Sequence, residues 1–174
     1  HFANGLLLRD LHNYWFSVDP VQQLVVELTE RDVLQDGDQH MAEHLHFKGV
    51  QLAIDDFGTG NTSLSWLEKL RPDVLKIDRS FTSSVGIDSV NATVTDIIIA
   101  LANRLHIVTV AEGVETLEQE SYLRSHGVDV LQGFYYARPM PVEAFPAWLA
   151  SREESEGESE TTEELAGRSG RRAW

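Results

Sequence analysis

Two adjacent carboxylates, Asp55 and Asp56, directly follow the mainly apolar run 50–54. Taking a charged group out of water costs several kcal/mol unless a counter-charge or a metal ion meets it. An apolar strand that ends in two neighbouring anions therefore indicates a site that binds a cation. Gly58 and Gly60 come next. Because glycine reaches backbone conformations closed to other residues, this loop can bend sharply and admit a ligand or partner to the main chain.

Four further short aliphatic runs also end in polar residues, which are Glu27, Lys76, Glu112 and Gln132. In a parallel barrel or a doubly wound sheet, the carboxyl ends of the strands assemble the active site. The repeated pattern therefore predicts one site at which these side chains meet.

The acidic side chains of this set favour hard divalent cations. Carboxylates on separate strand ends suit Mg²⁺ or Mn²⁺ better than copper or structural zinc. Two such ions roughly 3.5–4 Å apart can clamp the attacking and leaving oxygens of a phosphodiester. Lys76 could orient a water molecule and stabilise developing negative charge beside the ions. The alternative is a lysine that only neutralises its acidic neighbours, and the spacing does not separate the two roles.

His40 and His44 lie four residues apart on an expected helix and could grip a zinc ion from one face. The metalloprotease pattern requires glutamate where Met41 stands. We therefore interpret the two histidines as surface residues of an amphipathic helix.

Composition and charge exclude several classes of protein. Of the 174 residues, 42% are hydrophobic and 24% charged, as in a globular domain with a substantial core. The formal net charge of -14 argues against nonspecific binding to DNA or RNA. Without cysteine there are no disulfides or thiolate metal sites, and a reducing cytoplasmic setting is permitted. No apolar run approaches the ~20 residues of a membrane span.

Strand and helix signals alternate from about residue 24 to residue 148, which predicts an α/β domain with parallel strands and at least five strand–helix units. Helices are expected over about 39–47 with Gly49 as the stop, over 64–70, and over 89–105 before a strand at 107–111. Another helix begins at a capping box formed by Thr116 and Gln119 and ends at Gly127. A last helix opens at Pro141 and is cut or kinked by Pro146.

The domain prediction places one domain at residues 1–150 and an acidic tail at 151–174. The tail has almost no apolar side chains. Burial therefore cannot offset its ordering entropy, and we expect it to be mobile.

Five motifs occur in a family order over about residues 20–150. Together they resemble the EAL domain of cyclic di-GMP phosphodiesterases. The resemblance implies a modified TIM (β/α)8 barrel that hydrolyses cyclic di-GMP to linear pGpG with two Mg²⁺ or Mn²⁺ ions. It also implies a bacterial signalling protein, cytoplasmic in this part, whose full chain carries sensor or membrane segments. The motifs are Glu27-Leu28-Thr29-Glu30, Asp55-Asp56-Phe57-Gly58-Thr59-Gly60, Leu75-Lys76-Ile77-Asp78-Arg79-Ser80-Phe81, Val110-Ala111-Glu112-Gly113-Val114-Glu115, and Gln132-Gly133-Phe134 with Arg138-Pro139.

By the same resemblance, individual residues take expected roles. Lys76 is similar to the residue that holds the catalytic water, and Gln132 matches a position near water and substrate. Glu30 matches the glutamate that anchors the loop after the acidic pair, and this loop links catalysis to formation of a homodimer. The metal ligands are expected to be Glu27, Asp55, Asp56 and Glu112, with Gly58, Gly60, Asp78 and Pro139 at loop or substrate positions.

The chain departs from the family pattern in three places. No Glu-Ala-Leu segment precedes Glu27, so we expect an N-terminally truncated domain that lacks roughly two of the eight barrel strands. Asn4 is the available match to the family's asparagine ligand, but no Asn-x-Ser motif surrounds it. The loop reads Gly60-Asn61-Thr62-Ser63 where the family has Gly-Tyr-Ser-Ser, which could alter loop closure or the dimer interface.

Three functions remain open at this point. The first is a metal-dependent cyclic di-GMP phosphodiesterase. The second is a noncatalytic receptor or inactive fragment that keeps the nucleotide pocket without a complete metal site. The third is another metal-dependent α/β-barrel enzyme, because carboxylates at strand ends also suit enolate chemistry.

Overall fold

The computed structural model of the chain describes residues 24–29, 38–59, 64–86 and 90–152. Two compact units, His1–Ala137 and Arg138–Trp174, are described separately below. The first unit contains strands β1 (Val25–Thr29), β2 (Gln51–Phe57), β3 (Val74–Ile77), β4 (Val108–Ala111) and β5 (Val130–Leu131). Its helices are α2 (Asp38–Phe47), α3 (Leu64–Leu70), α4 (Arg79–Thr82), α5 (Val90–Leu105) and α6 (Leu117–Ser125).

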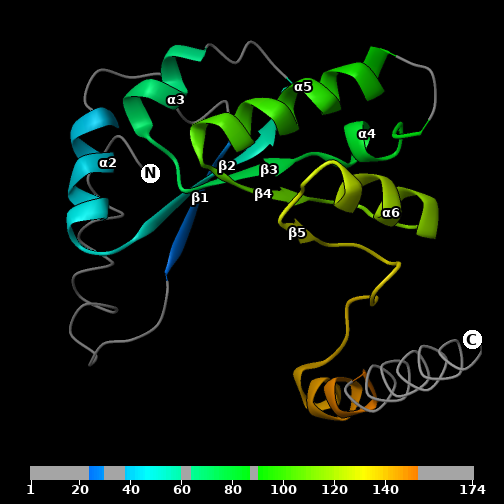
Figure 1. Ribbon diagram of the computed structural model, residues 1–174. Helices are drawn as coiled ribbons and strands as arrows, with labels where there is room; N and C mark the ends of the chain where they lie inside the picture. Colours follow the sequence, from blue (N-terminus) through cyan, green and yellow to red (C-terminus); the bar gives the residue numbers. More distant parts are fainter. Residues whose placement is uncertain (1–23, 30–37, 60–63, 87–89, 153–174) are drawn as a thin grey trace, which may run out of the picture. The chain divides into compact units, whose positions relative to one another are not determined.

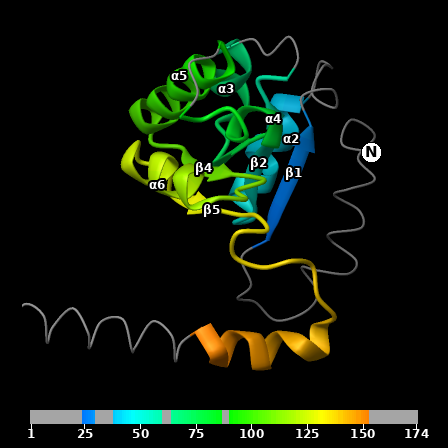
Figure 2. The same cartoon turned by 90° about the vertical axis from the view of Figure 1, so that its right-hand side faces the viewer.

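The five strands form one parallel sheet in the order β1-β2-β3-β4-β5. Helices α2, α3, α5 and α6 cover one face of it (Figures 1 and 2). Each strand pairs with its predecessor, and the order never reverses as it does in a doubly wound sheet. The described part therefore has the connectivity of a segment of a (β/α) barrel, and the predicted α/β class with parallel strands is confirmed.

Alternation along the strands separates the core from the opposite face. Leu52, Ile54, Leu75 and Ile77 are buried in the main hydrophobic cluster together with residues of the covering helices. Successive strand residues point to opposite faces. Lys76 therefore lies on the face away from the helices, where it pairs in register with Val110.

The helix ends follow the sequence prediction closely. Gly49 and Gly127 adopt φ of 77° and 83° after α2 and α6, as expected for helix stops. The equivalent positions after α3 and α5 are Arg71 and His106, with φ of 47° and 58°. Both residues adopt the left-handed backbone conformation that favours glycine. Their basic side chains also suit the negative, C-terminal end of the helix dipole.

The expected capping box at α6 is present, with Gln119 N donating to Thr116 Oγ1 at 3.3 Å and Thr116 N donating to Gln119 Oε1 at 3.1 Å. The short helix α4 was not expected from the sequence. His40 is about 90% exposed and contacts Glu43 at 3.5 Å, in keeping with a surface histidine.

The second unit is helical over residues 142–152 of its described part. A 3₁₀ turn, Val142–Ala144, follows Pro141 and runs directly into a helix at 145–152. The expected cut or kink at Pro146 is wrong, because this proline lies in the first turn of the helix, where the missing N–H has no intrahelical partner to lose. Phe145 and Trp148 stack with their ring centroids 5.7 Å apart. Across both units, the described helices include none that combines the length and the apolar character of a membrane span.

Candidate active site

Lys76 is the centre of the site. Its Nζ lies 3.0 Å from Glu27 Oε2, 3.0 Å from Asp55 Oδ1 and 2.7 Å from Glu112 Oε1. These carboxylates come from β1, from β2 and from the residue directly after β4. Because each oxygen lies within 3.0 Å of the same nitrogen, no two of them are farther apart than twice that distance. The predicted meeting of strand-end side chains is therefore observed for these four residues.

The ammonium is held in its charged form. The Lys76 side chain is only 12% exposed. Burial acts to lower the pKa of Lys76, but contacts with Glu112, Glu27 and Asp55 outweigh it and raise the pKa above its usual value. Three carboxylates against one ammonium nevertheless leave the cluster with an excess of negative charge.

Asp56 lies beside this cluster on an irregular stretch of β2. The register with β3 shifts between Ile54 and Phe57, and Asp56 adopts φ of 55°. A bulge of this kind breaks the alternation of a strand and re-aims its side chains. Aspartate is one of the few residue types that tolerate the left-handed conformation. Asp56 is exposed, whereas Asp55 is half-buried.

The loop after the acidic pair packs on α4. Gly58 adopts φ of 93°, and a side chain there would press on Phe81 and on Ile98 of α5. Asp78 caps α4 by accepting a hydrogen bond from Ser80 N at 2.9 Å. Burial acts to raise the pKa of Asp78, but the hydrogen bonds from Ser80 and the Arg79 backbone hold the pKa below its usual range. In the described structure Asp78 thus helps to position the wall against which the loop lies.

The segments that carry Glu112 and Gln132 are joined by backbone hydrogen bonds. Glu112 N donates to Ile77 O at 3.0 Å, Gln132 N donates to Ala111 O at 2.9 Å, and Val114 N donates to Gln132 O at 3.0 Å. Gly133 lies so close to the Val114 backbone that no Cβ could be placed there. The ends of β3, β4 and β5 are therefore tied into one rim, with the exposed Gln132 at its edge.

Four predicted site residues cannot be placed at this cluster. Asn4, Glu30 and Gly60 lie outside the described residues. Pro139 belongs to the second unit.

The cluster has the ligand chemistry that a hard divalent cation requires. Its donors are hard carboxylate oxygens in negative excess, as Mg²⁺ and Mn²⁺ prefer. Asp55 Oδ1 is buried and has no hydrogen-bond partner, although Lys76 Nζ stands at ion-pair distance from it. Within the described ranges, no three His, Asp or Glu side chains already have the spacing of a metal site. The residues fit a divalent cation chemically, and binding one would require the carboxylates to move inward.

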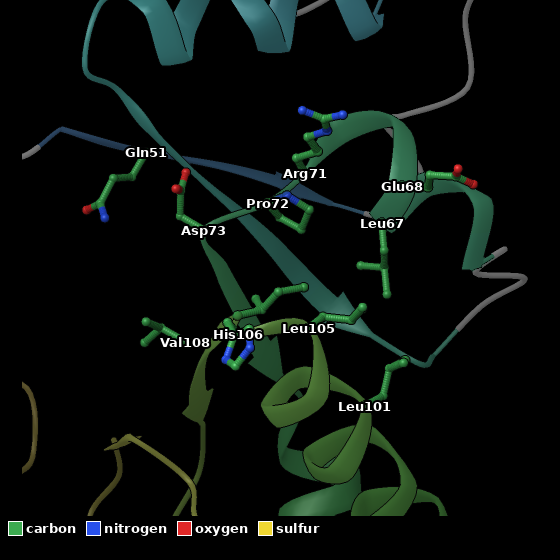
Figure 3. Close-up of a pocket in the computed structure, with 11 residues that line it drawn as sticks. Gln51, Leu67, Glu68, Arg71, Pro72, Asp73, Leu101, Leu105, His106 and Val108 are labelled. Carbon is green, nitrogen blue, oxygen red and sulfur yellow. The ribbon is translucent and has the colours of Figure 1, made fainter.

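The opposite end of the sheet carries a groove of different character. This groove, of about 760 Å³, lies where β2, β3 and β4 begin. Leu67 of α3 and Leu101 and Leu105 of α5 project toward one another across it (Figure 3). It is mainly apolar and contains none of the predicted site residues.

Two charged residues of the motifs, Arg79 and Glu115, have no role predicted from the sequence but lie beside the cluster. Arg79 Nη2 and Glu115 Oε1 form an ion pair of 2.8 Å, linking α4 to the loop after β4. Arg79 directly follows Asp78, and Glu115 lies three residues after Glu112. Their opposite charges at these positions were the sequence signal for an ion pair.

Comparison with known proteins places this geometry in a family. The EAL domain profile matches residues 2–139. The probable cyclic di-GMP phosphodiesterase PdeD of Escherichia coli (strain K12) is 65% identical over 150 residues, covering 86% of this chain and 28% of PdeD. The bifunctional diguanylate cyclase/cyclic di-GMP phosphodiesterase MucR of Pseudomonas aeruginosa is 42% identical over 153 residues, covering 86% of this chain and 22% of MucR. The chain thus spans less than a third of either relative.

Solved structures agree with this placement. The PaMucR phosphodiesterase in complex with c-di-GMP matches with a TM-score of 0.74 at 40% identity, covering 83% of this chain and 60% of that one. Klebsiella pneumoniae BlrP1 with manganese and the same nucleotide matches with a TM-score of 0.65 at 34% identity, covering 79% and 35%. A further BlrP1 complex contains calcium. Divalent metals therefore accompany the nucleotide in structures of relatives.

The chain belongs to the EAL domain family. The predicted family is confirmed, and the five-stranded parallel sheet is consistent with part of its TIM-type barrel.

Proposed function

We propose that this EAL domain hydrolyses cyclic di-GMP to linear pGpG with the help of two Mg²⁺ or Mn²⁺ ions. One observation carries the proposal, namely that Lys76 Nζ lies 2.7–3.0 Å from carboxylate oxygens of Glu27, Asp55 and Glu112. The family supports it, because PdeD and PaMucR are named as phosphodiesterases of this nucleotide or solved in complex with it.

In the proposed reaction, Lys76 performs two tasks. Its ammonium orients the attacking water by hydrogen bonding, and it stabilises the negative charge that develops on the phosphate oxygens. Low exposure of the side chain strengthens both effects, because water screens the charge less. Gln132, at the exposed edge of the rim, would contact water and substrate.

The carboxylates would hold the metal ions. Glu27, Asp55, Asp56 and Glu112 are the proposed ligands, with Asn4 as a further candidate. Bound divalent ions would supply Lewis acidity to the phosphodiester. The buried Asp55 Oδ1, which forms an ion pair with Lys76 at 3.0 Å, is in keeping with this assignment.

Regulation through the loop after Asp56 is part of the same proposal. Glu30 would anchor this loop, Gly58 and Gly60 would let it bend, and a homodimer would form through it. Asp78 supports the loop through α4, and Pro139 is proposed at a substrate or loop position. The cytoplasmic location, the 1–150 domain and the acidic tail also remain predictions.

Turnover by the purified chain tests the proposal. The chain is incubated with cyclic di-GMP and Mn²⁺, and pGpG is followed by chromatography alongside Lys76→Ala and Asp55→Asn. Lys69→Ala is the control, because Lys69 is an exposed lysine of α3 outside the cluster. We expect pGpG from the unaltered chain and the control, and little from the two site variants.

Other outcomes lead to different functions. Tight binding of cyclic di-GMP without product would favour the noncatalytic receptor. Equal turnover by Lys76→Ala and the unaltered chain would contradict the proposed role of the lysine.

A further inference from the structure

The aliphatic stem of Arg79 lies directly against Gly113. A Cβ built on Gly113 would collide with the stem at Arg79 Cγ and Cβ. Gly113 also adopts φ of 70°, a conformation that side chains other than glycine rarely reach. The loop after β4 can therefore approach α4 this closely only because residue 113 has no side chain.

The guanidinium of Arg79 reaches past Gly113 to the far side of the same loop. Its Nη2 lies 2.8 Å from Glu115 Oε1. Arg79 thus contacts the loop twice, once through its stem at Gly113 and once through its charge at Glu115. We call this pair of contacts the Arg79 clamp.

Both halves of the clamp lie close in sequence to residues of the cluster, Arg79 to Lys76 and the loop to Glu112. Glu112 directly precedes Gly113, and it makes the shortest of the three carboxylate contacts to Lys76, at 2.7 Å. Lys76 lies in β3, three residues before Arg79, which is the first residue of α4. A shift of the loop relative to α4 can therefore be passed on to the Glu112 side chain and its contact with Lys76.

The backbone of this loop is fixed only in part by hydrogen bonds. Glu112 N and Val114 N donate to Ile77 O and Gln132 O, on either side of Gly113. Gly113 between them is conformationally free, because it lacks a side chain. The ion pair itself adds little to stability, since Arg79 is 62% exposed and water screens the attraction of surface pairs. The use of the clamp is therefore to fix a position and not to add stability.

We propose that Arg79 is a positioning residue that holds the Glu112 carboxylate in place for metal binding and turnover by packing over Gly113 and pairing with Glu115. This inference rests on the proposed function, because it assigns Glu112 to the metal-binding set. Residues that orient a metal ligand typically change affinity or activity by about 10–100-fold when they are removed.

The test compares Arg79→Ala with Arg79→Lys, which keeps a stem and a positive charge. The Mn²⁺ dissociation constant is measured by calorimetry, and kcat and KM are measured for cyclic di-GMP. For Arg79→Ala we expect Mn²⁺ affinity and kcat each to fall about tenfold, with KM changed less than about twofold. Arg79→Lys should restore both to within about threefold. Circular dichroism of each variant before titration checks that it is fully folded, because a partly unfolded sample would itself show a weaker apparent affinity.

An exposed arginine of α5 provides the control. Arg104 lies exposed in the last turn of α5, at the end of the sheet where β4 begins, so Arg104→Ala removes a comparable cation without touching the clamp. Mn²⁺ affinity and kcat should stay unchanged. If Arg79→Ala behaves like this control, the proposal is overturned. If Arg79→Ala does not fold, Arg79→Met takes its place, and an Mn²⁺ affinity equal to that of the unaltered chain would overturn the proposal.

The outcomes separate this inference from the proposed function. If the chain binds Mn²⁺ but yields no pGpG, the proposed phosphodiesterase activity is contradicted. The Mn²⁺ affinities of the Arg79 variants then still test the positioning role of Arg79. If the chain makes pGpG equally well with and without the Arg79 side chain, the proposed activity is supported and the positioning role of Arg79 is contradicted. No Mn²⁺ binding by the unaltered chain would overturn both.

Discussion

Carboxylates occur at both ends of the parallel sheet, and their surroundings differ. At the strand starts, Asp129 Oδ2 accepts hydrogen bonds from Thr109 N and Thr109 Oγ1, both at 2.8 Å. Asp73 Oδ2 likewise accepts from Leu52 N at 2.8 Å. At the strand ends, Asp55 Oδ1 is buried and has an ion-pair neighbour, Lys76, but no hydrogen bond.

The difference separates carboxylates that hold strands together from those available for chemistry. Asp73 and Asp129 satisfy backbone N–H groups of the neighbouring strands β2 and β4, where an unmet donor would be costly. The cluster around Lys76 instead concentrates negative charge that only one ammonium opposes. In barrels of this kind the strand starts serve stability and the strand ends serve catalysis.

Replacing the ammonium should have the largest effect. In Lys76→Met the side chain keeps most of its volume and loses its charge, so the water is no longer oriented and phosphate charge is no longer stabilised. We expect kcat for pGpG formation to fall by about 10²–10³. The measurement is steady-state turnover in Mn²⁺, with Lys69→Met as a control on an exposed lysine of α3. Turnover within threefold of the unaltered chain would contradict a catalytic Lys76.

Neutralising a strand-end carboxylate should separate activity from stability. Asp55→Asn keeps the shape of the side chain and removes one proposed ligand, so turnover should fall by about 10²-fold. The free energy of unfolding in EDTA should change by less than about 1 kcal/mol, because the charge lost from the ion pair also relieves repulsion. Urea unfolding monitored by circular dichroism measures this. A loss of several kcal/mol would mean that Asp55 is a structural residue like Asp129.

A strand-start carboxylate should show the opposite behaviour. Asp129→Ala leaves the Thr109 N–H without its acceptor, and Thr109 is completely buried. We expect the free energy of unfolding to fall by about 2 kcal/mol, with the Mn²⁺ dissociation constant unchanged. Asp129→Asn retains an acceptor oxygen and should lose less than half as much. An altered Mn²⁺ affinity in folded Asp129→Ala would break the division between the two ends of the sheet.

The smallest effect is expected at the edge of the strand-start region. His46 Nε2 lies 3.1 Å from Asp73 Oδ2 in a partly exposed pair. Because Asp73 still accepts the hydrogen bond from Leu52 N, His46→Ala should cost only about 0.5 kcal/mol of unfolding free energy. Thermal unfolding at constant pH checks this. A loss as large as that of Asp129→Ala would show that the histidine is needed to hold Asp73.

Much of the fold could be read from local patterns. The run before Asp55, the capping box at Thr116 and the stop at Gly127 depend on neighbours within a few residues, and each was observed where it was expected. Pro146 shows the limit of such a reading, because its effect depends on where the helix begins. Whether it breaks the helix or lies in the first turn is set by backbone dihedrals that a list of residue types does not contain.

For the site, the sequence by itself determined which groups are present: carboxylates and a lysine at the ends of strands, within motifs of one family. Only the tertiary structure decided that Lys76 lies among three of these carboxylates, that Asp78 caps α4, and that Arg79 packs over Gly113. The physical reason is distance along the chain. Lys76 and Glu27 are 49 residues apart and meet only when parallel strands pair in register, so their contact is a property of the assembled sheet.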